Sequence, residues 1–116
     1  ILLMEFLGRE EVPYPQLRNA EVADYGVTYG EILGYIERLY QEARLVHADL
    51  SEYNILYHEK PYVIDMGQAV TLDHPRASAF LIRDIRNINR YFSRYCDVQD
   101  EQEIIGAVTG SRGRER

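Results

Sequence analysis

Two short apolar runs joined by a tight turn, in the middle of the chain, do most to limit how this sequence can fold. Ile55–His58 and Tyr62–Ile64 flank the turn residues Glu59, Lys60 and Pro61, and this pattern predicts a β-hairpin. Segments with helical periodicity lie on both sides of it. Because 116 residues suffice for a single globular domain, we predict one α+β domain that is mostly helical and contains a short hairpin.

The segment before the hairpin is predicted to form a helix from Thr28 to about Arg44. Thr28 and Glu31 have the spacing of a capping box. Apolar residues then recur at helical intervals, at Ile32, Ile36, Leu39, Tyr40 and Ala43. Upstream, residues 1–7 are predicted to be a short buried strand and residues 8–24 to be irregular.

The segment after the hairpin is predicted to form two further helices. Residues 75–95 carry an apolar stripe and begin with Pro75, which suits the first turn of a helix. A shorter helix is expected over about 99–108. The longer helix also presents a row of arginines, which we interpret as a solvated face, with contact to rRNA or a phosphoprotein as the alternative: Arg83, Arg86, Arg90 and Arg94.

Composition excludes several classes of protein. The N-terminal apolar run Ile1–Met4 is far shorter than the ~20 residues of a membrane-spanning helix, and it lacks the basic region of a secretory signal. Cys96 is the single cysteine, which excludes an internal disulfide and agrees with a cytoplasmic location. The net charge of −6 argues against autonomous, non-specific nucleic-acid binding.

Three oxygen-bearing side chains are placed where the hairpin can gather them. Asn54 precedes the first strand, Asp65 follows the second, and Asp49 lies on the loop just before. The outer ends of a hairpin are adjacent, so we expect these side chains to converge. Each alone is typical of a turn or a helix cap, but together they are the ligands that Mg²⁺ prefers in a phosphate-binding site.

The spacing of these residues resembles a known catalytic loop. His47-x-Asp49-x-x-x-x-Asn54 resembles the loop of the protein-kinase superfamily, and Ile64-Asp65-Met66-Gly67 resembles its metal-binding Asp-Phe-Gly segment. Longer strings resemble the RIO family of atypical kinases, nearest its first (RIO-one) branch: residues 45–56, 62–70, 73–77 and 80–87. The resemblance covers about residues 1–93 and implies the C-terminal lobe of a protein-kinase-like fold.

The resemblance also implies a role for each matching residue. Asp49 resembles the catalytic aspartate, and Asn54 and Asp65 resemble the metal ligands. In this family the aspartate equivalent to Asp65 can also accept phosphate. The residues that resemble the adenine-binding hinge and the apolar floor under the base are Met4, Glu5, Leu7, Leu56 and Ile64.

Two further residues are predicted to support the loop. We expect His47 to position the loop by packing and hydrogen bonding, with a titrating role as the alternative. Asp84 falls within an apolar stripe, where a lone carboxylate is costly to bury. We therefore expect Asp84 to accept N–H groups from the catalytic loop, as an aspartate of the corresponding helix does in the kinase superfamily.

The chain departs from ordinary protein kinases in ways that set further expectations. Ser51 stands where ordinary Ser/Thr kinases have a lysine, and the short segment from Asp65 to Pro75 leaves no room for an activation loop. No Gly-rich phosphate loop is present. We expect a hinge strand at 1–8, a C-terminal lobe at 9–109 and a disordered tail at 110–116. The partner of this lobe is then its own missing N-lobe, and the isolated chain is expected to bind Mg-ATP weakly and to turn over little.

The function that the resemblance implies is a RIO-type serine/threonine kinase or ATPase using ATP with Mg²⁺ or Mn²⁺. It also implies pre-40S particles of the small ribosomal subunit as partners, and no membrane. One alternative is a non-catalytic module in which ATP occupancy gates ribosome binding. Another is a small-molecule phosphotransferase, against which residues 73–77 and 83–87 argue.

Overall fold

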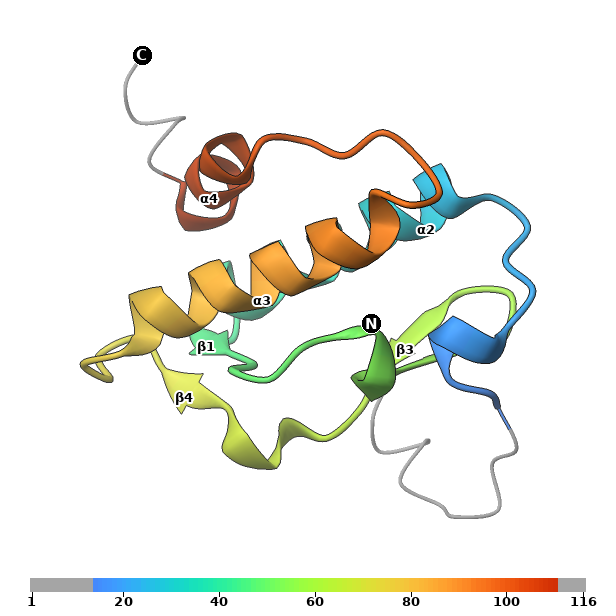
Figure 1. The fold of residues 1–116 in the computed structure, drawn as a ribbon. Helices are drawn as coiled ribbons and strands as arrows, with labels where there is room; N and C mark the ends of the chain where they lie inside the picture. Colours follow the sequence, from blue (N-terminus) through green and yellow to red (C-terminus); the bar gives the residue numbers. More distant parts are fainter. Residues whose placement is uncertain (1–13, 111–116) are drawn as a thin grey trace.

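The computed structural model describes residues 14–110, and within them three α-helices frame four short strands (Figure 1). The helices are α2 (Tyr25–Gln41), α3 (Ala77–Phe92) and α4 (Glu101–Thr109). The strands and two 3₁₀ turns lie between α2 and α3 in sequence. The predicted strand at 1–7 and the predicted tail from residue 111 onward lie outside the described residues. The α+β architecture, mostly helical with a short hairpin, is confirmed.

Asp24, and not Thr28, caps the N-terminus of α2. The Asp24 carboxylate accepts a hydrogen bond from the Val27 N–H at 3.1 Å, so the helix begins almost a turn earlier than predicted. Thr28 is buried within the helix, and its N–H donates to the Asp24 carbonyl. The predicted capping box of Thr28 and Glu31 is therefore wrong. The helix also ends before Arg44, which has a left-handed backbone with φ of 62°.

Helix α3 carries the predicted apolar stripe but begins at Ala77 rather than Pro75. His74 forms a turn first: its Nδ1 accepts from Arg76 N–H and its carbonyl accepts from Ala77 N–H, each at 3.0 Å. The helix ends at Phe92, three residues before the predicted end. The apolar residues buried from this helix are Ala77, Leu81, Ile85, Ile88, Tyr91 and Phe92.

Helix α4 ends where a glycine can take up the turn. Asp100 caps its N-terminus by accepting a hydrogen bond from Gln102 N–H at 2.9 Å. Gly110 follows its last residue with φ of 80°, a left-handed conformation that glycine adopts without steric cost. The helix thus occupies nearly the predicted range, and Gly110 belongs to its C-terminal cap.

The four strands form two separate antiparallel pairs. Strands β2 (Ile55–Tyr57) and β3 (Pro61–Val63) make the predicted hairpin, with Leu56 paired to Tyr62. Strands β1 (Leu45–Val46) and β4 (Val70–Thr71) make a second pair that was not predicted from the sequence. This second pair brings together the two ends of the segment 47–69, which contains the hairpin. We call residues 47–54, which lead into the hairpin, the central loop.

The core lies between the three helices and the hairpin. Helix α2 packs against α3 and α4, and α4 also packs on α3. In Figure 1 the strands lie on the side of α3 opposite α4. Side chains from every layer meet in one buried cluster, which includes Ile32, Leu50, Ile55, Ile85, Ile88, Phe92 and Ile104. The central loop therefore packs against α3, with Leu50 in the same buried cluster as Ile85 and Ile88.

Among residues 14–110, no helix has the length and apolar character that crossing a membrane requires.

Candidate active site

The hairpin has a buried face and a half-exposed face. Ile55, Tyr57 and Val63 are buried and point toward the core. Successive side chains of a strand point to opposite faces, so Leu56 lies on the other face. The N–H of Ile64 donates to the carbonyl of Asn54 at 2.9 Å, which extends the ladder to the outer end of the hairpin. Asn54, Leu56 and Ile64 consequently share one face.

The loop before the hairpin is held by side chains and not by a backbone ladder. Each N–H and each C=O of residues 48–50 has a side-chain partner. The N–H groups of Ala48, Asp49 and Leu50 donate to Asp84 Oδ2, His47 Nδ1 and Asp84 Oδ1; the carbonyls accept from Arg83 Nη2, Asn54 Nδ2 and Asn87 Nδ2. Five side chains therefore determine the path of this loop.

Asp84 bridges two of these backbone groups from the middle of α3. Its carboxylate accepts from Ala48 N–H at 2.8 Å and from Leu50 N–H at 3.0 Å, and its side chain is only 2% exposed. Burial raises the pKa of Asp84 above its ordinary value, while the hydrogen bonds from the Leu50 and Ala48 N–H groups act in the opposite direction. The expected contact of Asp84 with the loop is present.

His47 links the loop to the strand end that precedes Asp65. Its Nε2 lies 2.9 Å from the Ile64 carbonyl, and its Nδ1 lies 3.2 Å from the Asp49 N–H. A carbonyl can only accept and a backbone N–H can only donate, so Nε2 carries the proton and Nδ1 accepts. This buried imidazole has the geometry expected of a residue that positions the loop.

Asn54 and Asp65 are brought to the same end of the hairpin. Asn54 Nδ2 donates to the Asp49 carbonyl, which leaves the Asn54 amide oxygen available to a ligand. Asp65 has a left-handed backbone with φ of 62° and ψ of 61°, a conformation that aspartate tolerates better than most residues. The turn after it, η3 (Met66–Gln68), is held by Gln68 Nε2 donating to the Asp65 carbonyl at 2.5 Å.

The donor set fits a hard cation that also binds substrate phosphates. In residues 14–110 the carboxylate oxygens of Asp49 and Asp65 accept no hydrogen bond, and both residues are exposed. The same part of the chain contains no cluster of three or more His, Cys, Asp or Glu side chains that could hold a metal. Two carboxylates and one amide are a small, all-oxygen set, which suits Mg²⁺ because that ion keeps several waters and phosphate ligands.

The predicted floor residues are half-buried, as a base-contacting surface requires. Leu56 and Ile64 share the face of the hairpin that carries Asn54. The other edge of β2 is covered, because Tyr57 N–H donates to the Pro15 carbonyl at 2.9 Å and Gln16 pairs with Leu56. The predicted hinge residues Met4, Glu5 and Leu7 lie outside the described residues.

A family model described as "RIO domain" matches residues 1–104 of the chain. The chain belongs to the RIO family. Solved structures agree: two structures of the Rio2 kinase from Chaetomium thermophilum match 84% and 83% of the chain, and 34% of their own length, with TM-scores of 0.65 and 0.66 and 27% identity. One of them is a complex of that kinase with ADP, Mg²⁺ and phosphoaspartate. The chain thus has a protein-kinase-like fold.

Curated relatives of this RIO chain are longer than it is. Serine/threonine-protein kinase RIO1 of Homo sapiens is 44% identical over 94% of the chain and 20% of its own length. The RIO-type serine/threonine-protein kinase Rio1 of Thermoplasma acidophilum is 44% identical over 90% of the chain and 54% of its length. A probable RIO1 homolog of Encephalitozoon cuniculi is 50% identical over 81% of the chain and 24% of its length. These matches support the RIO1 branch.

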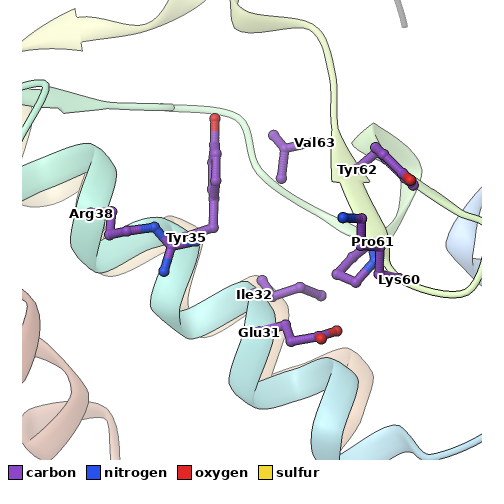
Figure 2. Close-up of a pocket in the computed structure, with 8 residues that line it drawn as sticks. All are labelled: Glu31, Ile32, Tyr35, Arg38, Lys60, Pro61, Tyr62 and Val63. Atoms are coloured by element: carbon purple, nitrogen blue, oxygen red, sulfur yellow. The ribbon is translucent and has the colours of Figure 1, made fainter. Parts of the chain in front are cut away.

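The RIO domain also has an open cavity of about 170 Å³ that does not belong to this site. It lies between α2 and β3, and Figure 2 shows Tyr35 and Arg38 on the helix at one side of it and Val63 and Pro61 at the other. Its other lining residues are Glu31, Ile32, Lys60 and Tyr62. Among the predicted site residues that fall within residues 14–110, none lines this cavity, and no motif in the sequence marks it.

Two residues that hold the loop of the RIO domain were missed from sequence. Arg83 was assigned to a solvated arginine face and Asn87 to no role, yet both bond to loop carbonyls. Their positions on the helix offered a signal, because residues 83, 84 and 87 lie close together on a helix surface. Arg86 and Arg90 behave differently: Arg86 bonds to Glu101 and Arg90 to the Asn87 side chain.

Proposed function

We propose that the full-length protein containing this chain is a RIO-type serine/threonine kinase or ATPase that uses ATP with Mg²⁺ or Mn²⁺. The observation that carries the proposal is the hydrogen-bonded linkage of Asp49, Asn54 and the strand end before Asp65. Asn54 bonds through its side chain to the Asp49 carbonyl and through its carbonyl to Ile64 N–H. His47 bonds to both the Asp49 N–H and the Ile64 carbonyl.

Each residue then has a distinct role in phosphoryl transfer. Asp49 orients the attacking hydroxyl or water and accepts its proton. Asn54 Oδ1 and the Asp65 carboxylate hold the metal ion, which when bound neutralises negative charge on the phosphates. Leu56 and Ile64 form the apolar surface under the adenine. His47 and Asp84 keep the loop in position through the contacts described above.

Asp65 is also a candidate acceptor of the phosphoryl group. In this route a carboxylate oxygen of Asp65 forms a bond to the γ-phosphorus, and the bond from that phosphorus to ADP breaks. Water then attacks the same phosphorus, Asp49 accepts the proton of the water, and the bond from phosphorus to the Asp65 oxygen breaks, which releases phosphate and restores the carboxylate. The proposal is supported by the exposed, unpaired Asp65 carboxylate within the described residues and by the phosphoaspartate in the related Rio2 kinase complex. Cytoplasmic pre-40S particles are the partners we propose for the full-length protein, by family resemblance.

The test is ATP turnover by the full-length protein, with γ-labelled ATP and acid quenching to trap an acid-labile phosphoprotein. We expect wild type to hydrolyse ATP and carry label, and Asp65→Asn to lose both. Asp49→Asn keeps the acceptor but lacks the general base, so turnover should fall by about 100-fold or more while label persists.

Other outcomes would lead to other functions. Wild-type protein that binds ATP without turning it over would contradict the enzyme and favour the module in which nucleotide gates ribosome binding. Turnover that persists in Asp65→Asn would remove both assigned roles of that residue. Label on serine of an added protein, with none on Asp65, would leave the kinase in place and remove the aspartyl-phosphate step.

A further inference from the structure

Arg83 is engaged differently from its neighbours on the arginine-rich side of α3. Its guanidinium lies over the ring of Phe80, 5.0 Å from the ring centroid, and its Nη2 donates to the carbonyl of Ala48. Arg86, one turn further along, instead forms an ion pair with Glu101 at 3.1 Å. Stacking on Phe80 therefore holds the Arg83 side chain in an orientation in which its guanidinium contacts the loop.

The Ala48 carbonyl belongs to the peptide that immediately precedes Asp49. The other end of the same peptide is the Asp49 N–H, which donates to His47 Nδ1. One donor and one acceptor thus hold the two ends of this peptide plane. Asp84 holds the peptides on either side through the Ala48 and Leu50 N–H groups, and Asn87 holds the carbonyl of Leu50; neither side chain bonds to this peptide.

 
Ala48 is 4% exposed and has a left-handed backbone with φ of 76°, which is unfavourable for a residue with a Cβ atom. Rotation of the peptide after Ala48 would change ψ of Ala48 and φ of Asp49, and it would break both hydrogen bonds that hold the peptide plane. Because the peptide leads directly into Asp49, such a rotation would also redirect the Asp49 side chain.

We propose that Arg83 is a positioning residue that sets the direction of the Asp49 carboxylate by holding the Ala48 carbonyl. The inference rests on the proposed function, because Arg83 would orient Asp49, the proposed general base. It also distinguishes Arg83 from Arg86 in the arginine row, since Arg83 bonds to the loop and Arg86 joins α3 to α4.

The experiment compares three variants of the full-length protein. Arg83→Met keeps a long stem to cover Phe80 and removes every donor, whereas Arg83→Lys keeps a charged donor. Arg86→Met is the matched control on the same helix. We expect Arg83→Met to lower kcat for ATP turnover at least tenfold, on the order of the effect of a slightly misplaced catalytic group, with KM for ATP little changed. Arg83→Lys should recover part of the loss, and Arg86→Met should keep the wild-type kcat.

A second readout does not depend on turnover. Amide hydrogen exchange should be at least about tenfold faster at Ala48, Asp49 and Leu50 in Arg83→Met than in wild type, because local opening of the loop becomes easier. Exchange there should be unchanged in Arg86→Met. If wild type has no turnover, the proposed function fails while the exchange result still decides whether Arg83 holds the loop. Wild-type exchange in Arg83→Met, or a fall in kcat that Arg86→Met shares, would overturn the inference.

Discussion

Asp84 has an almost completely buried carboxylate, yet its two oxygens are directed at the backbone and not at a basic side chain. The two N–H groups that it accepts, from Ala48 and Leu50, lie on either side of Asp49. Both of those residues are buried, so water cannot replace the carboxylate as an acceptor. A single side chain in α3 therefore fixes the backbone before and after the proposed general base.

Asp84→Ala should lower both stability and activity. Two buried N–H groups would lose their acceptor, so we expect the free energy of unfolding to fall by about 2–4 kcal/mol. Urea unfolding of the full-length protein measures this loss, and ATP turnover at a temperature where the variant is folded measures the effect on the site. Unchanged stability and unchanged turnover together would contradict the assigned contact.

At the scale of single residues, the site was predictable where the signal lay in spacing along the chain. Asp49, Asn54 and Asp65 were proposed as a site because a hairpin must bring its outer ends together, and the bond from Ile64 N–H to the Asn54 carbonyl is consistent with that proposal. The contacts of Arg83 and Asn87 were not found, since they depend on how α3 lies against a loop far away in sequence. The pattern of α3 alone is equally compatible with a solvated arginine face.

Helix α2 is the element whose start was predicted incorrectly. Thr28 and Glu31 match a capping box in sequence, but Asp24 also matches a cap and has the extended backbone of one. With Asp24 as the cap, Thr28 and Tyr29 lie inside the helix and are buried. The small β1–β4 pair was missed for another reason: two-residue strands are too short to show a periodic pattern.

The two possible caps of α2 can be separated by mutation. Asp24→Ala should lower the free energy of unfolding by about 1 kcal/mol, because the Val27 N–H loses its acceptor. Glu31→Ala, at the exposed position that the capping box would have used, should change it by less than about 0.5 kcal/mol. Chemical denaturation of both variants provides the comparison. A larger loss for Glu31→Ala than for Asp24→Ala would restore the capping box.

Across the whole molecule, tyrosines join α2 to the C-terminal half. The Tyr29 hydroxyl donates to Asn89 Oδ1 at 2.6 Å and accepts from Gln99 N–H at 3.0 Å. Tyr25 stacks on Tyr95 with ring centroids 4.2 Å apart. Burial raises the pKa of Tyr91 above the ordinary tyrosine value, and the neighbouring Tyr95 adds to that shift. The packing of the helices thus depends on phenols that stay protonated.

The raised pKa of Tyr91 predicts loss of stability in alkali. The folded protein holds this proton more tightly than the unfolded chain does. The stabilisation is therefore complete below the ordinary value of 10.0 and is lost as the pH rises above it. Thermal unfolding measured from pH 8 to pH 11 should show a shallower decline for Tyr91→Phe than for wild type. Tyr53→Phe, at a residue that is 52% exposed, is the matched control, and an identical decline in all three would contradict the prediction.

The loop that carries Asp49 has a consequence for the order in which the chain folds. Its bonds to α3 connect residues that are 34 to 37 positions apart, whereas α2 and α3 are built from bonds between near neighbours. Contacts between distant residues form late, because the intervening chain must first be closed into a loop. We therefore expect the helices to form first and the candidate active site to be the last part of the molecule to acquire its shape. A nascent chain would reach its helical content well before its candidate catalytic side chains were held in place.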